Sequence, residues 1–380
     1  MKIIKYLALI LLLWGIPSFF SYDEAIGSQF SLLMIGMLIL YYFFSKKRGI
    51  VLPFLFLGVL YFVISGLVYL AGDPMFFRND LIKYVVVVIC GAELARDTSK
   101  KELFVLLMLG ASSILIHAIF FQGGFGRYSG LFLDPNGAGF VCVIAYCLSF
   151  RIKPHKLKLL GQFLITFAGL LTFSRTFIIL WLLVSIISVI SDRKNSLNFG
   201  LGVGALIVIF TVGSLLKVDA VRFNALENLF SDNNKSSISV IQDDSRTKTW
   251  SRYYEDILDR PILGNGYRQL SGIDEDKQGV HNAYLMVIGE AGIIPFLIFL
   301  GIYLYMLFKS TPLYKDEEYK PMLATTLLII LMTTHNYFDN FFLIFISIWL
   351  FIRITENISD TDVLEENEDS EEAELLNTTA

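Results

Sequence analysis

Several arginines of this sequence, which is 55% hydrophobic, are candidates for binding an anionic substrate. Arg175 lies in "LTFSRTF", between two apolar runs that leave almost no room for a loop. A charge so close to apolar runs is costly in a membrane and usually faces a cavity or a partner. The alternative is a side chain that reaches up to the lipid headgroups. Arg175 is therefore a candidate ligand for an anion.

A second arginine, Arg127, lies in "GRYSGLFLDPNGAG", nine residues before Asn136. Pro135 and the surrounding glycines would delay the start of a helix and expose backbone N–H groups, which can bind an anion. An ordinary junction between a loop and a helix uses the same residue types. We expect Arg127 and Asn136 to contribute to the same kind of site as Arg175.

Histidine offers proton transfer on the same side of the chain. His281 and Asn282 begin the stretch "HNAYLMVIGEAGIIPF", where a long polar segment gives way to an apolar run. A single histidine is most often structural, but imidazole titrates near neutral pH and suits acid–base work. A second pair, His335 and Asn336, ends a later apolar run and is a weaker candidate for the same cavity.

Long apolar runs must position these residues. The sequence has 33 Phe and only 17% charged residues, and its mean hydropathy is +0.61. Runs close to the roughly 20 residues needed to cross a bilayer predict helices, because lipid offers no partner to an open strand edge. The sequence predicts an all-α, polytopic bundle of about twelve membrane helices, at 3–20, 29–45, 50–71, 80–95, 103–121, 131–150, 157–173, 176–191, 199–216, 283–308, 321–338 and 340–354.

Basic residues predict the orientation of these helices. With the N-terminus in the cytoplasm, the short inner loops hold fifteen Lys and Arg, and the short outer loops hold three. Helices one to nine then occupy 1–216, a large extracytoplasmic loop covers 217–281, and helices ten to twelve occupy 282–354. The tail 355–380 carries ten acidic residues and no basic one, which predicts a disordered cytoplasmic segment.

The large loop carries further arginines. Arg252, Arg260 and Arg268 alternate with acidic residues at helical spacings, a pattern typical of solvated ion pairs. The stretch "DRPILGNGY" predicts the end of a helix followed by a turn. The acids at 274–276 lack a metal-binding spacing, the chain has no nucleotide-binding loop, and no cofactor, metal or nucleic-acid partner is predicted.

Taken together, the stretches "RYSGLFLDPNGAG", "LTFSRT", "SRTKTW…DRPILGNGY" and "HNAYLMVIGEAGII" resemble the O-antigen ligase and O-antigen polymerase superfamily. The resemblance covers roughly residues 120 to 300 and includes the family pattern of His-Asn, nine residues and then Gly292. Pro295 departs from the ligase version of this pattern and favours a polymerase.

The resemblance implies transfer of a glycan from undecaprenyl diphosphate to an acceptor hydroxyl, at the outer face of the bacterial inner membrane. Arg175 and a loop arginine, Arg222 or Arg246, would bind the diphosphate in place of a metal. His281 would act as the base or orient the acceptor, and Arg127, Asn136 and Asn282 would contact the substrate.

The partners implied are a lipid-linked oligosaccharide, an acceptor glycan or lipid-linked repeat unit, membrane lipid and a polysaccharide chain-length regulator. Two other classes of protein stay open. A transporter or flippase for lipid-linked sugars would also need arginines in a cavity, but it would spread charge through the bilayer. A non-catalytic envelope scaffold would leave His281 and the arginines without a role.

Overall fold

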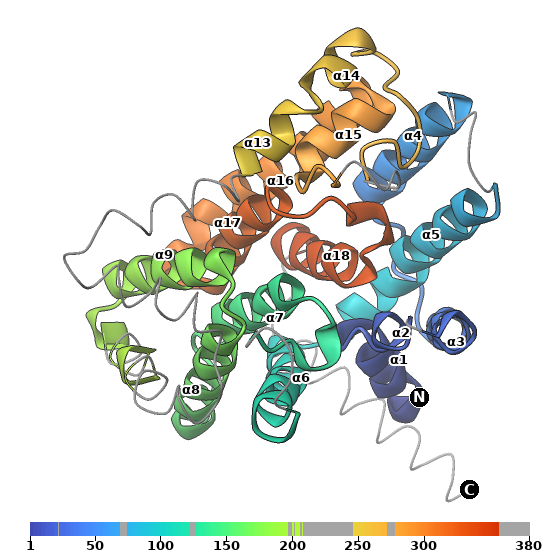
Figure 1. Ribbon diagram of the computed structural model, residues 1–380. Coiled ribbons are helices and arrows are strands. Elements are labelled where there is room, and N and C mark those ends of the chain that lie inside the picture. The colour runs from blue at the N-terminus through green and yellow to red at the C-terminus, as the bar shows by residue number, and fades with distance from the viewer. Residues whose placement is uncertain are drawn as a thin grey trace, which may run out of the picture.

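The computed structural model describes residues 1–21, 23–68, 74–121, 127–196, 200, 202–205, 207, 246–271 and 278–356. Every regular element in these ranges is a helix (Figure 1), which confirms the predicted all-α class. Eleven of the twelve predicted apolar runs overlap helices, whereas most of the run 199–216 lies outside the described residues.

The first part of the chain forms a series of apolar helices. They are α1 (Lys2–Leu13), α2 (Ile16–Phe19), α3 (Glu24–Phe44), α4 (Leu52–Val68), α5 (Pro74–Arg96) and α6 (Lys100–Phe120). Gly15 has φ +63° and divides the first apolar run into α1 and α2. Asp23 and Ser99 cap α3 and α6, since each side chain accepts hydrogen bonds from the first-turn backbone N–H groups.

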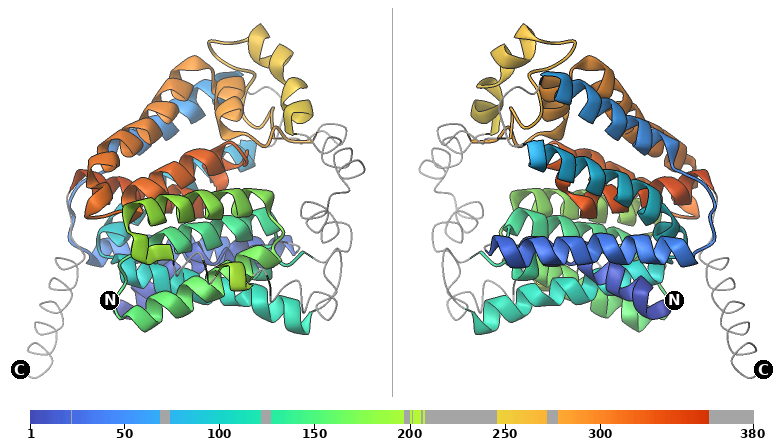
Figure 2. Two further views of the ribbon diagram at one scale, coloured as in Figure 1. Left: turned by 90° about the vertical axis from the view of Figure 1, so that its left-hand side faces the viewer. Right: turned by 90° about the vertical axis from the view of Figure 1, so that its right-hand side faces the viewer.

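The remaining elements are η1 (Gly130–Phe132), α7 (Pro135–Leu148), α8 (His155–Leu171), α9 (Arg175–Ser191), η2 (Arg193–Asn195), α13 (Arg246–Ser251), α14 (Tyr254–Asp259), α15 (Ala283–Ala291), α16 (Ile293–Ser310), η3 (Thr311–Lys315), α17 (Tyr319–Leu331), η4 (Tyr337–Asp339) and α18 (Phe341–Thr355). The predicted run 283–308 is thus two helices, α15 and α16, which meet at Gly292. Figure 2 shows α13 and α14 at the end of the bundle opposite the N-terminus.

Within the described residues, three helical spans are long and apolar enough to cross a membrane, namely Ala25–Phe44, Lys100–Phe120 and Ile293–Lys315. Shorter apolar helices surround them, and large apolar side chains such as Leu67, Phe120 and Ile190 are exposed on the outside of the bundle. So much exposed apolar surface is typical of a protein whose solvent is lipid.

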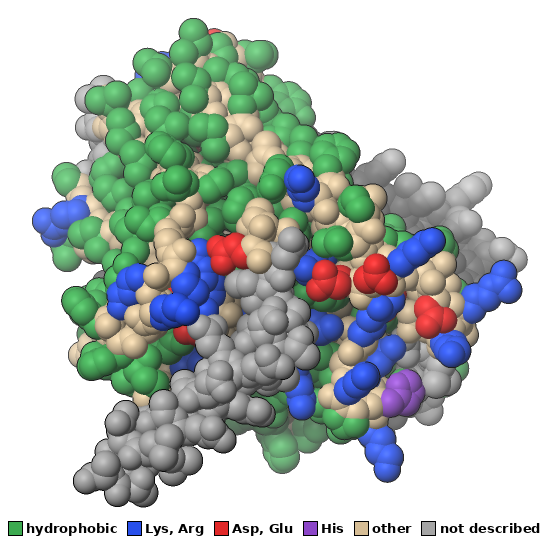
Figure 3. Space-filling view, turned by 180° about the vertical axis from the view of Figure 1, so that it is seen from behind, with side chains coloured by type: hydrophobic (Ala, Val, Ile, Leu, Met, Phe, Trp, Pro, Cys, Tyr) green, Lys and Arg blue, Asp and Glu red, His purple; other side chains and the backbone are tan. Residues whose placement is uncertain are grey.

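The end of the bundle that holds the N-terminus is rich in paired charges. Lys5 Nζ lies 2.7 Å from Glu102, and Arg96 contacts Glu93 at 3.0 Å and Glu356 at 2.7 Å. Figure 3 shows basic and acidic side chains gathered on this face. Segments predicted to share one side of the membrane therefore lie together, and Glu356, in the predicted solvated tail, is bound to Arg96.

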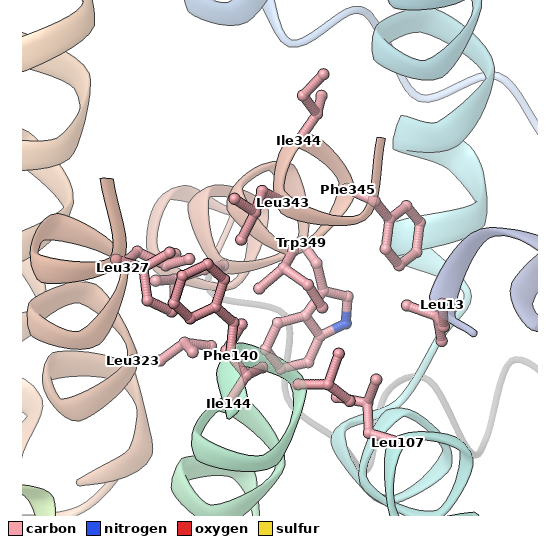
Figure 4. Close-up of a cluster of buried hydrophobic side chains, with 14 of the residues drawn as sticks. Leu13, Leu107, Phe140, Ile144, Leu323, Leu327, Leu343, Ile344, Phe345 and Trp349 are labelled. Atoms are coloured by element: carbon pink, nitrogen blue, oxygen red, sulfur yellow. The ribbon is translucent and has the colours of Figure 1, made fainter. Parts of the chain in front are cut away.

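Helix α18 forms the centre of the bundle. Its side chains from Leu343 to Leu350 are all buried, and Trp349 donates a hydrogen bond to the carbonyl of Thr98 at 2.8 Å. Figure 4 shows Trp349 among side chains of other helices, including Leu107 and Ile144. A helix that is apolar on every side is buried in the interior. The surrounding helices take their positions from it.

Candidate functional site

Helices α7 and α9 begin side by side at the end opposite the N-terminus. Asp134 caps α7 by accepting a hydrogen bond from Gly137 N at 2.8 Å, and Ser174 caps α9 by accepting from Phe177 N at 3.4 Å. A Cβ on Gly139 would lie only 3.0 Å from Ser174 Cβ, so the two helices touch. Their N-termini add the positive ends of two helix dipoles to this part of the surface.

Arg127 lies beside these two helix starts. Its Nε donates to the carbonyl of Thr172 at 3.1 Å, and its Nη2 donates to Asn136 Oδ1 at 3.2 Å. The neighbouring Tyr128 N donates to the carbonyl of Leu171 at 3.2 Å. The structure therefore brings together the "RYSG" and "LTFSR" stretches and places the predicted residues Arg127 and Asn136 in direct contact.

Arg175 is the first residue of α9, and its side chain is exposed. The two predicted loop arginines, Arg222 and Arg246, lie wholly or partly outside the described residues. Arg246 begins α13, but its side chain lies outside the described part of the chain, as does the whole of Arg222. Arg127 and Arg175 thus flank the starts of α7 and α9, where guanidinium groups and helix N-termini together could bind an anion.

His281 and His335 form a pair. Their Nδ1 atoms are 3.1 Å apart, and the two rings are perpendicular with centroids 4.4 Å apart. His281 directly precedes Asn282 and α15, whereas His335 lies in the connection between α17 and η4. Burial, followed by the charge of nearby His281, lowers the pKa of His335 to about 4. His335 is therefore neutral near pH 7, and the pair can hold or move one proton.

The backbone at His281 adopts a left-handed conformation, with φ +46°. A non-glycine residue in this region is sparsely populated and persists only where the surrounding structure holds it. The adjacent Asn282 does so by capping α15: its side-chain oxygen accepts from Tyr284 N at 3.0 Å and from Leu285 N at 3.2 Å. Asn282, predicted as a substrate ligand, thus fixes the turn that presents His281.

The loop stretch "DRPILGNGY" packs on the break between α15 and α16. Gly292 has φ +79°, and a Cβ there would lie 1.9 Å from the carbonyl oxygen of Ile262. Asn265 N donates to the carbonyl of Gly289 at 2.7 Å, and Ile293 N donates to that of Pro261 at 3.0 Å. The predicted turn is confirmed. The stretches "DRPILGNGY" and "HNAYLMVIGEAGII", both part of the resemblance, pack directly against each other.

Arg268 lies in a network that the sequence did not predict. It contacts Asp80 of α5 at 3.0 Å and Asp339 of η4 at 3.3 Å, and the Tyr267 hydroxyl also donates to Asp80. The expectation that Arg268 forms solvated pairs with nearby loop acids is wrong, because the chain folds it back onto the helices. Arg252 and Arg260 are exposed, as expected. Burial raises the pKa of Asp339 to about 7, against the opposing effect of Arg268.

Glu290 is a further charged residue that the sequence reasoning missed. It is 0% exposed within α15 and accepts hydrogen bonds from the Tyr61 hydroxyl, from Leu270 N at 3.0 Å and from the Ser271 hydroxyl at 3.2 Å. The signal was available, since a carboxylate inside an apolar run is rarely accidental. Its partners show that it holds the loop on the bundle.

Helix α17 lies between the arginine group and the histidine pair (Figure 1). It packs against α7 and α9, and on the other flank Tyr284 of α15 donates to the carbonyl of Leu328 at 3.1 Å. Both groups therefore lie at the same end of the bundle. Chemically, the arginines at this end could bind an anion, and the histidine pair could take up a proton.

A family model described as O-antigen ligase matches residues 160–300. No curated protein matches the chain. The matched residues include Arg175, the docked loop, His281 and the break between α15 and α16. The resemblance to the O-antigen ligase and polymerase superfamily is confirmed over residues 160–300 by this match.

Proposed function

From the O-antigen ligase match over residues 160–300, we propose that the chain transfers a glycan from an undecaprenyl-diphosphate-linked donor to an acceptor hydroxyl. The reaction takes place at the outer face of the bacterial inner membrane, with both termini in the cytoplasm. The observation that carries the proposal is the His281–His335 pair, at the same end of the bundle as Arg127 and Arg175.

The arginine group would bind the diphosphate. As the bond between sugar and diphosphate breaks, negative charge grows on the leaving group, and guanidinium groups stabilise it through short, charge-assisted hydrogen bonds. Arg175 at the start of α9 and Arg127 beside α7 would take this role, and Arg222 or Arg246 would complete it from the loop. No metal is required in this scheme.

His281 would remove the proton from the acceptor hydroxyl as that oxygen bonds to the sugar. A positioned general base of this kind is worth roughly 10² to 10⁴ in rate. The loop, bound to Glu290 and Asp80, would cover the reacting groups. Pro295, in the first turn of α16, favours a polymerase over a ligase.

The direct test uses the purified protein in lipid nanodiscs with a lipid-linked repeat unit as both donor and acceptor. We expect release of undecaprenyl diphosphate together with an elongated glycan. Release only after a separate glycan acceptor is added would identify a ligase. In sealed vesicles, movement of intact lipid-linked sugar without release would identify a flippase. If neither release nor movement is observed, a scaffold is favoured. Co-purification with a chain-length regulator tests that partner.

A further inference from the structure

We propose that His335 is a positioning residue that accepts the Nδ1–H of His281, which makes Nε2 of His281 the basic atom. The inference deepens the proposed function and rests on it for the identity of the reaction. The pair itself is a property of the fold: its members are 54 positions apart and belong to different elements, yet their Nδ1 atoms lie 3.1 Å apart.

The direction of the hydrogen bond follows from the two charge states of a base. Neutral imidazole has one donor and one acceptor nitrogen, and imidazolium has two donors. Once His281 has taken a proton, its Nδ1 can only donate, so His335 Nδ1 must accept. If neutral His281 already donates from Nδ1, the hydrogen bond has the same direction before and after protonation. His335 then keeps one tautomer throughout the reaction. The proton then arrives at Nε2 of His281.

The other side of the His335 ring, which carries Nε2, faces Gly279. If its Nδ1 is an acceptor, its Nε2 must carry the hydrogen and needs an acceptor nearby. A Cβ placed on Gly279 would lie 2.7 Å from His335 Nε2 and 2.8 Å from the carbonyl oxygen of Ser271. His335 Nε2 and the carbonyl of Ser271 therefore both border Gly279, and the absence of a side chain at Gly279 makes room for the ring.

His335 keeps the same charge while His281 titrates. Burial lowers the pKa of His335, so it stays neutral over the range in which a catalytic histidine works. The charged groups of the neighbouring elements are bound elsewhere: Arg268 to Asp80 and Asp339, and Glu290 to Leu270 and Ser271. His335 thus orients the base as the carboxylate of a catalytic triad does, but without adding a negative charge.

Three substitutions test whether His335 orients the ring of His281 or only packs against it. His335→Ala removes the acceptor and should lower kcat roughly 10-fold to 10²-fold at unchanged donor KM, an effect smaller than the roughly 10² to 10⁴ expected from loss of the base itself. His335→Asn keeps an acceptor oxygen at the δ position and should recover much of the rate. His335→Asp adds a charge beside His281 and should move the acidic limb of the pH–rate profile to higher pH by roughly one pH unit or more.

The matched control is His155→Ala, because His155 is exposed at the start of α8 and distant from the pair. It should leave both rate and pH profile unchanged. A fully active His335→Ala variant would overturn the proposal, and so would an acidic limb that stays in place in a folded His335→Asp protein.

A measurement without turnover completes the test. Nitrogen-15 spectra of histidine-labelled protein in detergent should show hydrogen on Nδ1 and none on Nε2 of neutral His281, and the reverse for His335. Reversed tautomers in an active enzyme would overturn the positioning role alone. The expected tautomers in a protein that releases no undecaprenyl diphosphate would support the pair and overturn the proposed reaction.

Discussion

Arg268 and Arg127 lie at the same end of the bundle, but the contacts that the structure describes for them differ in kind. Arg268 is bound by two carboxylates, Asp80 and Asp339. Arg127 donates to the backbone carbonyl of Thr172 and to the amide oxygen of Asn136, which hold its guanidinium beside the starts of α7 and α9. The first arrangement fastens a loop to the helices, whereas the second orients a guanidinium beside two helix N-termini, a setting that suits an anionic ligand. The setting of an arginine therefore decides its role more than its position in a polar loop does.

The largest loss of turnover should follow substitution of His281, because neither Arg127 nor Arg268 can act as a base near neutral pH. His281→Ala should lower kcat by roughly 10² to 10⁴, while donor binding survives because the arginine group remains. His281→Gln should behave similarly, since it lacks basicity, and the wild-type rate should fall at acidic pH as the imidazole becomes charged.

Turnover and donor binding can be measured separately with a labelled lipid-linked sugar. A His281→Gln variant near the wild-type rate would reduce His281 to an orienting residue. Loss of donor binding in His281→Ala would move His281 into the anion site and remove the division between the two groups.

Next in size is the effect of Arg175→Lys, which keeps the charge but loses the two-point grip of a guanidinium. We expect activity to fall roughly 10-fold to 10²-fold at an unchanged melting temperature. This range corresponds to the loss of hydrogen bonds to a charged group, which are worth about 1.5–3 kcal/mol. Arg252→Lys, at an exposed loop position, is the matched control. Full activity of Arg175→Lys and Arg175→Ala at normal protein levels would make Arg175 a headgroup anchor.

Arg268→Met should have the opposite profile. It leaves Asp80 and Asp339 without their guanidinium partner, so the free energy of unfolding should fall by about 1–3 kcal/mol while donor KM changes little. Thermal unfolding and limited proteolysis of the loop measure this, with Arg260→Met as the exposed control. A raised donor KM at an unchanged melting temperature would place Arg268 in the anion site and end the contrast with Arg127.

A smaller effect concerns pH and the same network. Burial raises the pKa of Asp339 to about 7 from an ordinary value of 3.8, so the folded protein holds a proton that the unfolded chain has released. Its contribution to stability is complete below the unfolded pKa and is lost as pH rises through about 7. Asp339→Asn should flatten the fall in melting temperature between pH 4 and 8, and an unchanged slope would contradict the assignment.

The smallest expected change is none at all. If guanidinium groups supply the positive charge, turnover should persist in excess EDTA. Loss of activity that Mg²⁺ or Mn²⁺ restores would contradict the metal-independent scheme and turn attention to Asp274, Glu275 and Asp276, which lie outside the described residues.

The sequence was a good guide to features that depend on local composition. Apolar runs predicted the helices, and basic residues predicted which loops lie together, because both signals arise from the membrane and not from particular contacts. The contact between Arg127 and Asn136 could also be expected, since both belong to one short stretch. The predicted roles of Arg222 and Arg246 stay predictions.

Long-range pairings could not be obtained in this way. The partner of Arg268 is Asp80, 188 positions away, and the helical spacing of nearby acids favoured a local pair instead. The contact between His281 and His335 depends on how α15 and α17 pack, which no spacing in one sequence encodes. The break at Gly292 was equally hidden, because its cause is the backbone of a loop about thirty residues earlier.

The docking of the loop also bears on how the protein is made. A chain is synthesised from its N-terminus, so Ser65 and Asp80 leave the ribosome before the stretch 260–271, whereas Glu290 and Asp339 leave it afterwards. Tyr267 N and Arg268 bind the earlier residues, and Leu270 N binds Glu290. A nascent chain that ends before η4 lacks the Asp339 contact. We therefore expect full protease resistance of the loop only after η4 has been translated and has bound Arg268.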